Sequence, residues 1–433
     1  DDSSIRLDLT RPTKIALTFT TDGTDFDNSD DYTYLKEGAS VTMNIDPSEE
    51  INQPIVMLFK KAADGLFEPS DTTNPTGDFT IVDVVGSDNW TFTKSLAAEH
   101  AEGEVEFNLS FTDLVGNELA ATITSLDVNA TKVWYDKTAP AVQEVISWGS
   151  NNTDCGDDDC SNFAIPGNSV TLVFTTLENV QIPTVKIGRQ EVVPSQTSNG
   201  NHRSWTATRV MDGSETINDG ANNTLINTIP FTIGLKDFAE ISSASWFSDS
   251  SNGGFTGTQI TFDNTGPSLE SADITSNNDV AANNKYAQEG DVVTIVIEAG
   301  ETVKASTITA IVAGVSSAGN DANKPSISLG ADDNGNADQK ITVSKVMTAS
   351  DPTGSIAFSV TFSNVNGFPY DNGGAVTENN LTGSSVFYDR TKPTIDSFTI
   401  VCSGEQEDPS GNKYATIDDV ITVTLQTSED INK

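Results

Sequence analysis

The chain has 433 residues, enough for about three domains of ordinary size. Its 63 Asp and Glu residues outnumber its 23 Lys and Arg residues, and the formal net charge is −40. This balance argues against nucleic acid or an anionic membrane as a partner and favours divalent cations, and no apolar run reaches the roughly 18 residues that a membrane-spanning helix needs.

The motif Asp-x-Thr-x-Pro occurs four times, beginning at positions 8, 136, 263 and 389, which lie 128, 127 and 126 residues apart. This spacing predicts a tandem repeat of about 127 residues. The predicted full repeats cover residues 13–140, 141–267 and 268–393. Residues 1–12 are predicted to be the last strand of a preceding repeat, and residues 394–433 the start of a further one. We therefore expect the sequence to be an excerpt of a longer repeat protein.

Early in each repeat, an aromatic residue leads into a short apolar run and then a glutamate. The aromatic residues are Tyr34, Phe163, Tyr286 and Tyr414, and the glutamates are Glu49, Glu178, Glu301 and Glu429. Later, apolar and polar residues alternate over 105–111, 229–235 and 356–362. Two residues beyond these strands come Asp113, Asp237 and Asn364. Alternation with a period of two predicts strands with one buried face, as in an antiparallel sandwich.

These short strands, the frequent turn residues and the lack of a convincing amphipathic helix predict an all-β fold. Residues 95–100 could form one helical turn. The stretch Asp113–Asn117 reads Asp-Leu-Val-Gly-Asn, which is typical of a tight turn.

With its linkers and this turn, the chain resembles the tandem immunoglobulin-like repeats of large bacterial and archaeal surface proteins, and of some algal and protist ones. The linker is intact in all four copies, and the Gly-Asn turn after the alternating strand is intact only in repeat 1. The resemblance implies immunoglobulin-like β-sandwiches of about 127 residues in a linear array, located outside the cell or on its surface.

In such a sandwich the loop after strand B and the loop between strands F and G lie at the end where the linker enters. Carboxylates from these three places would meet at each joint between repeats and repel one another, and calcium would relieve this by taking 6–8 oxygen ligands. The predicted ligands are Asp8, Glu49 and Asp113; then Asp136, Glu178 and Asp237; then Asp263, Glu301 and Asn364; and finally Asp389 and Glu429. The alternative is that these residues only cap turns or face solvent.

Cys155 and Cys160 flank Gly-Asp-Asp-Asp and are predicted to form a disulfide, with two free thiols as the alternative. Cys402 has no partner in its own partial repeat. It could pair with a residue outside this excerpt, pair between chains or stay a free thiol. Acidic residues are also frequent in residues 22–31 and 154–159. These segments are interpreted either as a second calcium-binding loop or as a solvated acidic loop.

Six Asn-x-Ser/Thr sequons are candidates for glycosylation, although several would arise by chance in a chain rich in Asn and Thr. They begin at Asn89, Asn108, Asn129, Asn151, Asn222 and Asn380. Asn108 is the sharpest case because the alternating pattern places it on the polar face of its strand.

We expect no enzyme, because the motifs of zinc peptidases, serine hydrolases and nucleotide-binding enzymes are missing and the two histidines, His100 and His202, share no repeat position. The predicted function is a structural module of an extracellular assembly, such as a surface layer or an appendage filament. Its partners would be copies of itself or other subunits of that assembly. The alternatives are the stalk of a cell-surface adhesin and a carbohydrate-binding or carbohydrate-cleaving region, which a row of exposed aromatic residues would favour.

Overall fold

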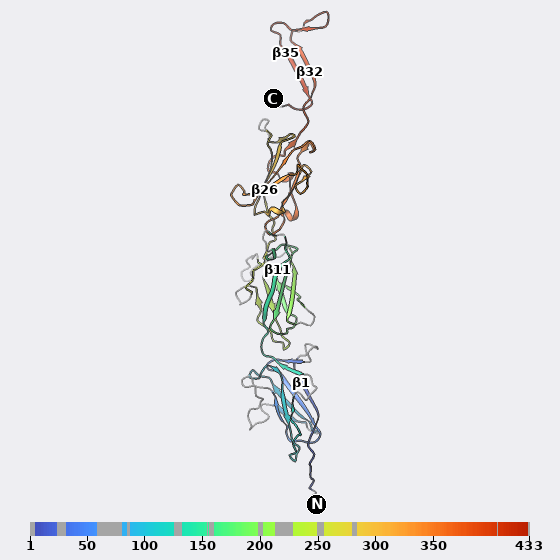
Figure 1. Ribbon diagram of the computed structural model, residues 1–433, viewed down its shortest axis with the longest axis vertical. Coiled ribbons are helices and arrows are strands. Elements are labelled where there is room, and N and C mark those ends of the chain that lie inside the picture. The colour runs from blue at the N-terminus through green and yellow to red at the C-terminus, as the bar shows by residue number, and fades with distance from the viewer. Residues whose placement is uncertain are drawn as a thin grey trace. The chain divides into compact units, whose positions relative to one another are not determined.

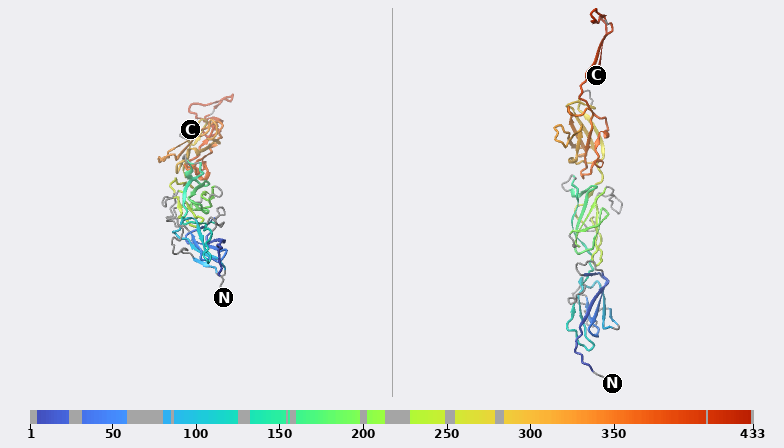
Figure 2. Two further views of the ribbon diagram at one scale, coloured as in Figure 1. Left: turned by 60° about the horizontal axis from the view of Figure 1, so that its bottom comes forward. Right: turned by 90° about the vertical axis from the view of Figure 1, so that its right-hand side faces the viewer.

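The computed structural model describes most of the chain, and its secondary structure is strands, turns and short 3-10 helices (Figures 1 and 2). The described residues are 5–23, 32–58, 80–84, 87–124, 132–153, 155, 160–197, 202–212, 228–248, 255–278, 284–404 and 406–431. The helices among them are η2 (Cys160–Asn162), η4 (Ala305–Thr307), η5 (Tyr370–Gly373) and η6 (Glu378–Asn380). None of these is long and apolar enough to cross a membrane.

Repeat 1 contains two main sheets, ordered β1-β3-β6-β5 and β4-β8-β9, and a small sheet ordered β2-β10-β7. Its strands are β1 (Lys14–Thr21), β2 (Tyr32–Leu35), β3 (Ser40–Pro47), β4 (Ile55–Leu58), β5 (Thr80–Asp83), β6 (Trp90–Ser95), β7 (Gly103–Glu104), β8 (Phe107–Ser110), β9 (Ile123–Thr124) and β10 (Lys132–Tyr135). The possible helical turn over residues 95–100 is instead a strand end followed by a turn, in which the His100 N–H donates to the carbonyl of Ala97 at 3.1 Å.

Repeat 2 has the same plan, with sheets ordered β11-β13-β17-β16 and β15-β14-β18-β19 and a short parallel pair of β12 and β20. Its strands are β11 (Val142–Ser150), β12 (Phe163–Ala164), β13 (Ser169–Thr176), β14 (Thr184–Ile187), β15 (Gln190–Val192), β16 (Ser195–Gln196), β17 (Ser204–Val210), β18 (Phe231–Gly234), β19 (Trp246–Phe247) and β20 (Thr261–Phe262).

Repeat 3 again has two main sheets, ordered β21-β23-β27-β26 and β25-β24-β29-β30, with the small sheet β22-β31-β28. Its strands are β21 (Leu269–Ser276), β22 (Tyr286–Ala287), β23 (Val292–Ala299), β24 (Thr309–Val312), β25 (Val315–Ser316), β26 (Ser326–Gly330), β27 (Lys340–Val346), β28 (Gly354–Ser355), β29 (Phe358–Thr361), β30 (Val376–Thr377) and β31 (Phe387–Tyr388). Residues 314–338 are rich in polar side chains and contain β25 and β26.

The strand order identifies each repeat as an immunoglobulin-like sandwich. With the main strands lettered A to G along a repeat, one sheet is ordered A-B-E-D and the other carries C, F and G, which is the arrangement of immunoglobulin constant-type domains. Repeats 2 and 3 add a strand C′ at the edge beside C. The chain is therefore an all-β array of tandem sandwiches.

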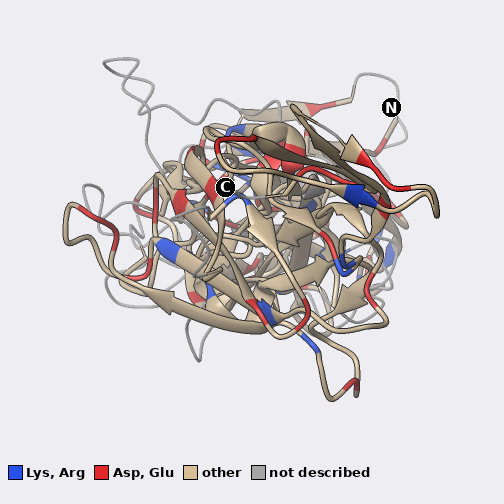
Figure 3. Ribbon diagram, turned by 90° about the horizontal axis from the view of Figure 1, so that it is seen from above, with Lys and Arg blue, Asp and Glu red and all other residues tan. Residues whose placement is uncertain are grey.

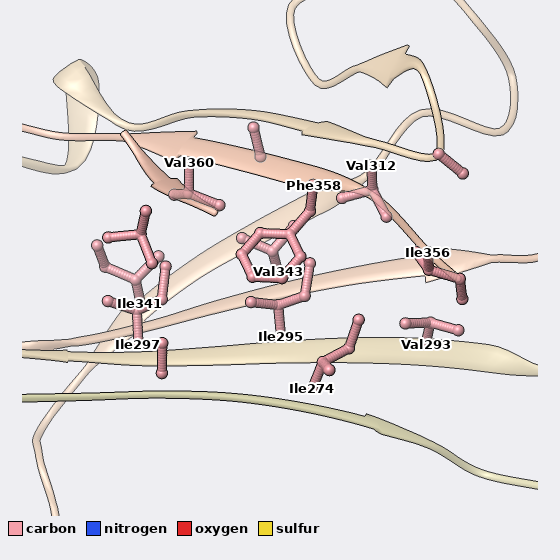
Figure 4. Close-up of a cluster of buried hydrophobic side chains, with 14 of the residues drawn as sticks. Ile274, Val293, Ile295, Ile297, Val312, Ile341, Val343, Ile356, Phe358 and Val360 are labelled. Carbon is pink, nitrogen blue, oxygen red and sulfur yellow. The ribbon is translucent and has the colours of Figure 1, made fainter. Parts of the chain in front are cut away.

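Each sandwich has its own hydrophobic core, made of the inward faces of both sheets. In repeat 3, Ile295 and Val343 from the first sheet point toward Phe358 and Val360 from the second (Figure 4). In repeat 2, Trp205 is 1% exposed. Burying a large apolar side chain contributes about 1.5–3 kcal/mol, so the alternating pattern is what holds the two sheets together.

The chain divides into two compact units, of which the first holds repeats 1 and 2 and the second holds repeat 3 with the segment after it. That segment contains the antiparallel pair β32 (Ile395–Cys402) and β35 (Ile421–Thr427), with β33 (Gln406–Glu407) and β34 (Lys413–Tyr414) between them. This pair matches strands A and B of the full repeats, including the register shift after the first residue of strand A.

The described part of residues 1–12 forms no strand with another described segment, so its assignment to a preceding repeat stays a prediction. Ile5 and Leu7 are 99% and 82% exposed, and neither pairs with another described segment. A strand is stable only with a hydrogen-bonding neighbour, so the apolar residues alone do not create one.

Candidate metal centre

The linker aspartates have a fixed local geometry. One carboxylate oxygen of Asp136 accepts a hydrogen bond from the N–H of Thr138 at 3.0 Å, and Asp8 and Asp389 do the same with the residue two positions on, each at 2.8 Å. This is an Asx turn, which fixes the side chain and leaves its second oxygen available. Pro140, which ends the second copy of the motif, is buried.

In each full repeat, the loop after strand B is tied to the loop between strands F and G. The bridging residue lies two positions after the predicted glutamate, and its partner is the polar residue after strand F. The bridges join Ile51 to Asp113, Val180 to Asp237, and Val303 to Asn364. These backbone pairs bring the glutamate and the F–G loop residue to the same end of each sandwich.

At the joint between repeats 1 and 2, the structure brings together the three predicted acids Asp136, Glu178 and Asp237. Each offers a carboxylate oxygen, and these oxygens lie within 4.8 Å of one another. Two oxygens bound to one calcium ion at about 2.3–2.6 Å can be at most about 5 Å apart, so one ion fits between them.

Within this cluster, Asp237 has a buried carboxylate oxygen that accepts no hydrogen bond. Its side chain is 1% exposed, and while Oδ1 accepts the Ile241 N–H at 2.8 Å, Oδ2 has no hydrogen-bond partner. A buried carboxylate oxygen without a partner is costly, and it is ordinarily found where an ion or another donor binds.

The electrostatics of the cluster point the same way. Burial, followed by the charges of Asp136 and Asp237, raises the pKa of Glu178 to about 7. Burial also raises the pKa of Asp237 to about 6, with Asp136 as the main charge working in that direction. The pKa of Asp136 is raised as well, chiefly by burial. Three carboxylates that resist ionisation together form a site of strong negative potential once all are charged.

Aromatic side chains pack beside the acids. Tyr34 of repeat 1 meets Phe238 of repeat 2 edge to face, with ring centroids 5.4 Å apart, and His202 also packs edge to face against Phe238 at 5.1 Å. A hollow of about 240 Å³ lies between these rings and the acidic cluster, with Arg203 on its lining. Asp237 is buried beside this hollow, and burial strengthens charge interactions inside the joint.

A second cluster at the start of repeat 1 joins Asp8, Glu49 and Asp113, again with ligand oxygens within 4.8 Å. Burial and the charges of Asp8 and Asp113 raise the pKa of Glu49. Burial acts to raise the pKa of Asp113 too, but hydrogen bonds from the side chain and backbone of Asn117 outweigh it and lower that pKa.

The remaining predicted joint residues have different surroundings. The carbonyl oxygen of the Asn364 side chain accepts the N–H groups of Asn366 and Phe368, and its amide donates to the carbonyl of Thr265 at 3.1 Å. Asp263 belongs to the first compact unit and Glu301 to the second. In the fourth copy, burial and neighbouring Asp389 raise the pKa of Glu429.

Both Cys155 and Cys160 are in a disulfide, while Cys402 is free. Of the acidic stretches, residues 24–31, 154 and 156–159 lie outside the described residues, and Asp22 Oδ1 accepts the Ser40 N–H at 2.7 Å. Among the sequons, Asn129 and Asn222 lie outside the described part of the chain, Asn151 is exposed, and Asn89, Asn108 and Asn380 are half-buried.

Two further copies of the Asp-x-x-Gly-Asn turn, at Asp332–Asn336 and Asp408–Asn412, were not predicted. Asn117 was given no role either, although its side-chain amide donates to Asp113 and to the linker carbonyl of Asp8. The Asp-x-x-Gly-Asn pattern itself could have revealed the extra turns.

No protein-family model and no curated protein sequence matches the chain. Among solved structures it is similar to a marsupial T cell receptor, with 10% identity, 80% of this chain and 96% of that chain covered, and a TM-score of 0.30. It is also similar to Rst D1-D2, with 9% identity, coverage of 59% and 100%, and a TM-score of 0.21. A third is Dpr2 Ig1-Ig2 in complex with DIP-Theta Ig1-Ig3, with 12% identity, coverage of 57% and 100%, and a TM-score of 0.16. Because these scores are low, the immunoglobulin-like assignment rests on the strand order of each repeat.

Proposed function

We propose that the chain is a structural, non-catalytic part of an extracellular assembly, and that a calcium ion bound by Asp136, Glu178 and Asp237 stiffens the joint between repeats 1 and 2. The immunoglobulin-like repeats would act as spacers of nearly constant length. Their partners would be copies of this chain or other subunits of a surface layer or filament, and the stalk of an adhesin would use the same modules in the same way.

One observation carries the cation proposal: the fully buried Asp237 has an unpartnered carboxylate oxygen and lies in a cluster with two other carboxylates. Without a cation, three like charges would meet in a partly dry joint. With a bound cation, each carboxylate coordinates the positive ion, and the linker is fastened to both loops of the next sandwich.

The donor set favours calcium among common ions. All three side chains offer hard oxygen ligands, which suit calcium and magnesium better than zinc or copper. The ligands come from a linker and two loops, so the remaining positions would be filled by water or backbone carbonyls in an irregular shell. Calcium tolerates such a shell, whereas magnesium demands a near-ideal octahedron.

An extracellular location is supported by the disulfide of Cys155 and Cys160, because disulfides persist mainly in oxidising compartments. Asp and Glu outnumber Lys and Arg, as the red and blue positions on the ribbon in Figure 3 show, and this excess suits surroundings in which salt and divalent cations screen the charge.

Calcium titration of the full chain by calorimetry tests the proposal. We expect Glu178→Gln to lower the affinity of the joint site by about tenfold or more, because ligand charge sets calcium affinity. Glu144→Gln removes one charge from an exposed position on β11 of the same repeat and should leave the affinity unchanged. Equal binding by both variants, or no binding by the unaltered chain, would contradict the proposed site.

A further inference from the structure

Among the described residues, four turns that begin with an aspartate share one backbone geometry but differ in the side chain of their fifth residue. In each, the N–H of the fifth residue donates to Oδ1 of the first residue, an aspartate, at 2.6–2.8 Å, and the aspartate N–H donates back to the carbonyl of the fifth residue. The fourth residue has a positive φ in all of them. The turns are Asp113–Asn117, Asp237–Ile241, Asp332–Asn336 and Asp408–Asn412.

The fifth residue decides what happens to the second oxygen of the aspartate. Where it is asparagine, the side-chain amide donates to Oδ2 at 2.7, 2.8 and 2.9 Å in the three turns. Isoleucine has no donor, so in the turn that begins at Asp237, Oδ2 is buried without a partner. The loss of one amide therefore leaves this carboxylate oxygen free for a different ligand.

The joints between repeats also differ in whether a side-chain amide connects the F–G loop to the linker. At the first joint the amide of Asn117 also donates to the linker carbonyl of Asp8 at 3.2 Å, and in repeat 3 the amide of Asn364 donates to the linker carbonyl of Thr265 at 3.1 Å. A neutral amide thus ties the F–G loop to the preceding linker in both places. Both the first and the second joint have a carboxylate cluster. At the second joint Asp237 and Ile241 have no side-chain amide, so a carboxylate oxygen of Asp237 is left unpartnered, whereas the matching oxygen of Asp113 accepts from Asn117.

We propose that the residue four positions after the F–G loop aspartate selects how a joint is held: asparagine ties loop and linker by hydrogen bonds, and isoleucine at position 241 frees Asp237 to bind a divalent cation. The second joint is thus cation-dependent, and the first is held without an ion. This inference rests on the proposed cation site and adds the residue that controls it.

Reciprocal substitutions in the full chain test the inference, with calcium binding followed by calorimetry. Ile241→Asn copies the other three turns, so it should fold and should lower the calcium affinity of the second joint by about tenfold or more, the size of effect typical of altered partners of metal ligands. Ile241→Val keeps the apolar character and should bind as the unaltered chain does. Asn117→Ile should add a second calcium ion per chain at Asp8, Glu49 and Asp113.

The outcomes separate this inference from the proposed function. If the unaltered chain binds calcium and Glu178→Gln abolishes binding, but Ile241→Asn binds with unchanged affinity, position 241 is not the selector and the site itself stands. If the unaltered chain binds no calcium, both proposals fail. Circular dichroism of each variant establishes that it is folded, and should Asn117→Ile unfold, Ile241→Asn against Ile241→Val still decides the inference.

Discussion

At the joint between repeats 1 and 2, Asp237 is a candidate metal ligand because one of its carboxylate oxygens lacks the amide donor that the corresponding aspartates of the other turns have. The amide of Asn412 is the main cause that lowers the pKa of Asp408 to about 2, whereas Asp237, with Ile241 in place of that amide, has a pKa raised to about 6 chiefly by burial. Turns with the same backbone thus give their aspartates opposite tendencies to carry charge. Two differences separate these aspartates: the side chain four residues later supplies or withholds a donor, and Asp237 is buried whereas Asp408 is only half-buried.

The raised pKa values predict how pH affects the chain when cations are removed. Protonation of Glu178 relieves repulsion in the folded joint. Its stabilising effect is therefore complete below pH 4.5, the ordinary pKa of the group, and is lost as pH rises through its raised pKa of about 7. For Asp237 the ordinary pKa is 3.8 and the raised pKa is about 6. In chelator, we expect the thermal unfolding temperature to fall between pH 5 and pH 8. Calorimetry at constant ionic strength measures this.

The control for that experiment must separate the joint from the general repulsion of a chain with a net charge of −40. Glu178→Gln should flatten the pH dependence, and Glu144→Gln should retain it. Calcium should shrink the dependence of the unaltered chain, because the ion offsets the same charges. A slope that is identical in all three chains would show that the joint acids do not contribute.

At the scale of strands and turns, the backbone imposes its own requirements. Gly335 has a φ of +88°, a conformation that costs a residue with a side chain about 1–2 kcal/mol, and no atom lies within 4 Å of a Cβ added there. Gly335→Ala should therefore destabilise repeat 3 by about this amount through the backbone alone. Gly330→Ala is the matched control, because its added Cβ is equally free and its φ is not positive. Chemical denaturation measures both, and equal stabilities would contradict the assigned turn.

Strand positions were predictable from the sequence to the extent that side chains alternate. The alternating runs became β8, β18 and β29, and the apolar runs before the glutamates became β3, β13, β23 and β35. The short strands β25 and β26 were not predictable, because they lie at sheet edges in a polar segment. The closeness of Glu178 to Asp237 followed from the order of strands, whereas the free oxygen of Asp237 depends on a hydrogen bond that only the folded turns reveal.

At the scale of the molecule, a bound calcium ion would limit the flexibility of the joint between repeats 1 and 2. Each sandwich has its own hydrophobic core. The three joint acids, Asp136, Glu178 and Asp237, are not part of either core. Removing calcium should therefore loosen the joint and leave the sandwiches folded. In water, each pair of like charges at about 4 Å repels by about 1 kcal/mol, and by more in a partly dry joint.

Small-angle scattering with and without chelator measures the loosening, and circular dichroism follows the folded sandwiches. We expect chelation to broaden the distribution of dimensions while the β-sheet signal stays constant. The Ile241→Asn chain should scatter alike in both conditions, because its joint would be tied by an amide like that of Asn117. Calcium should restore the original scattering of the unaltered chain, and magnesium at the same concentration should do so poorly, since the irregular loops cannot offer an octahedral shell. Scattering that does not change on chelation, in a chain shown to release bound calcium, would mean that the ion fills the site without stiffening the joint.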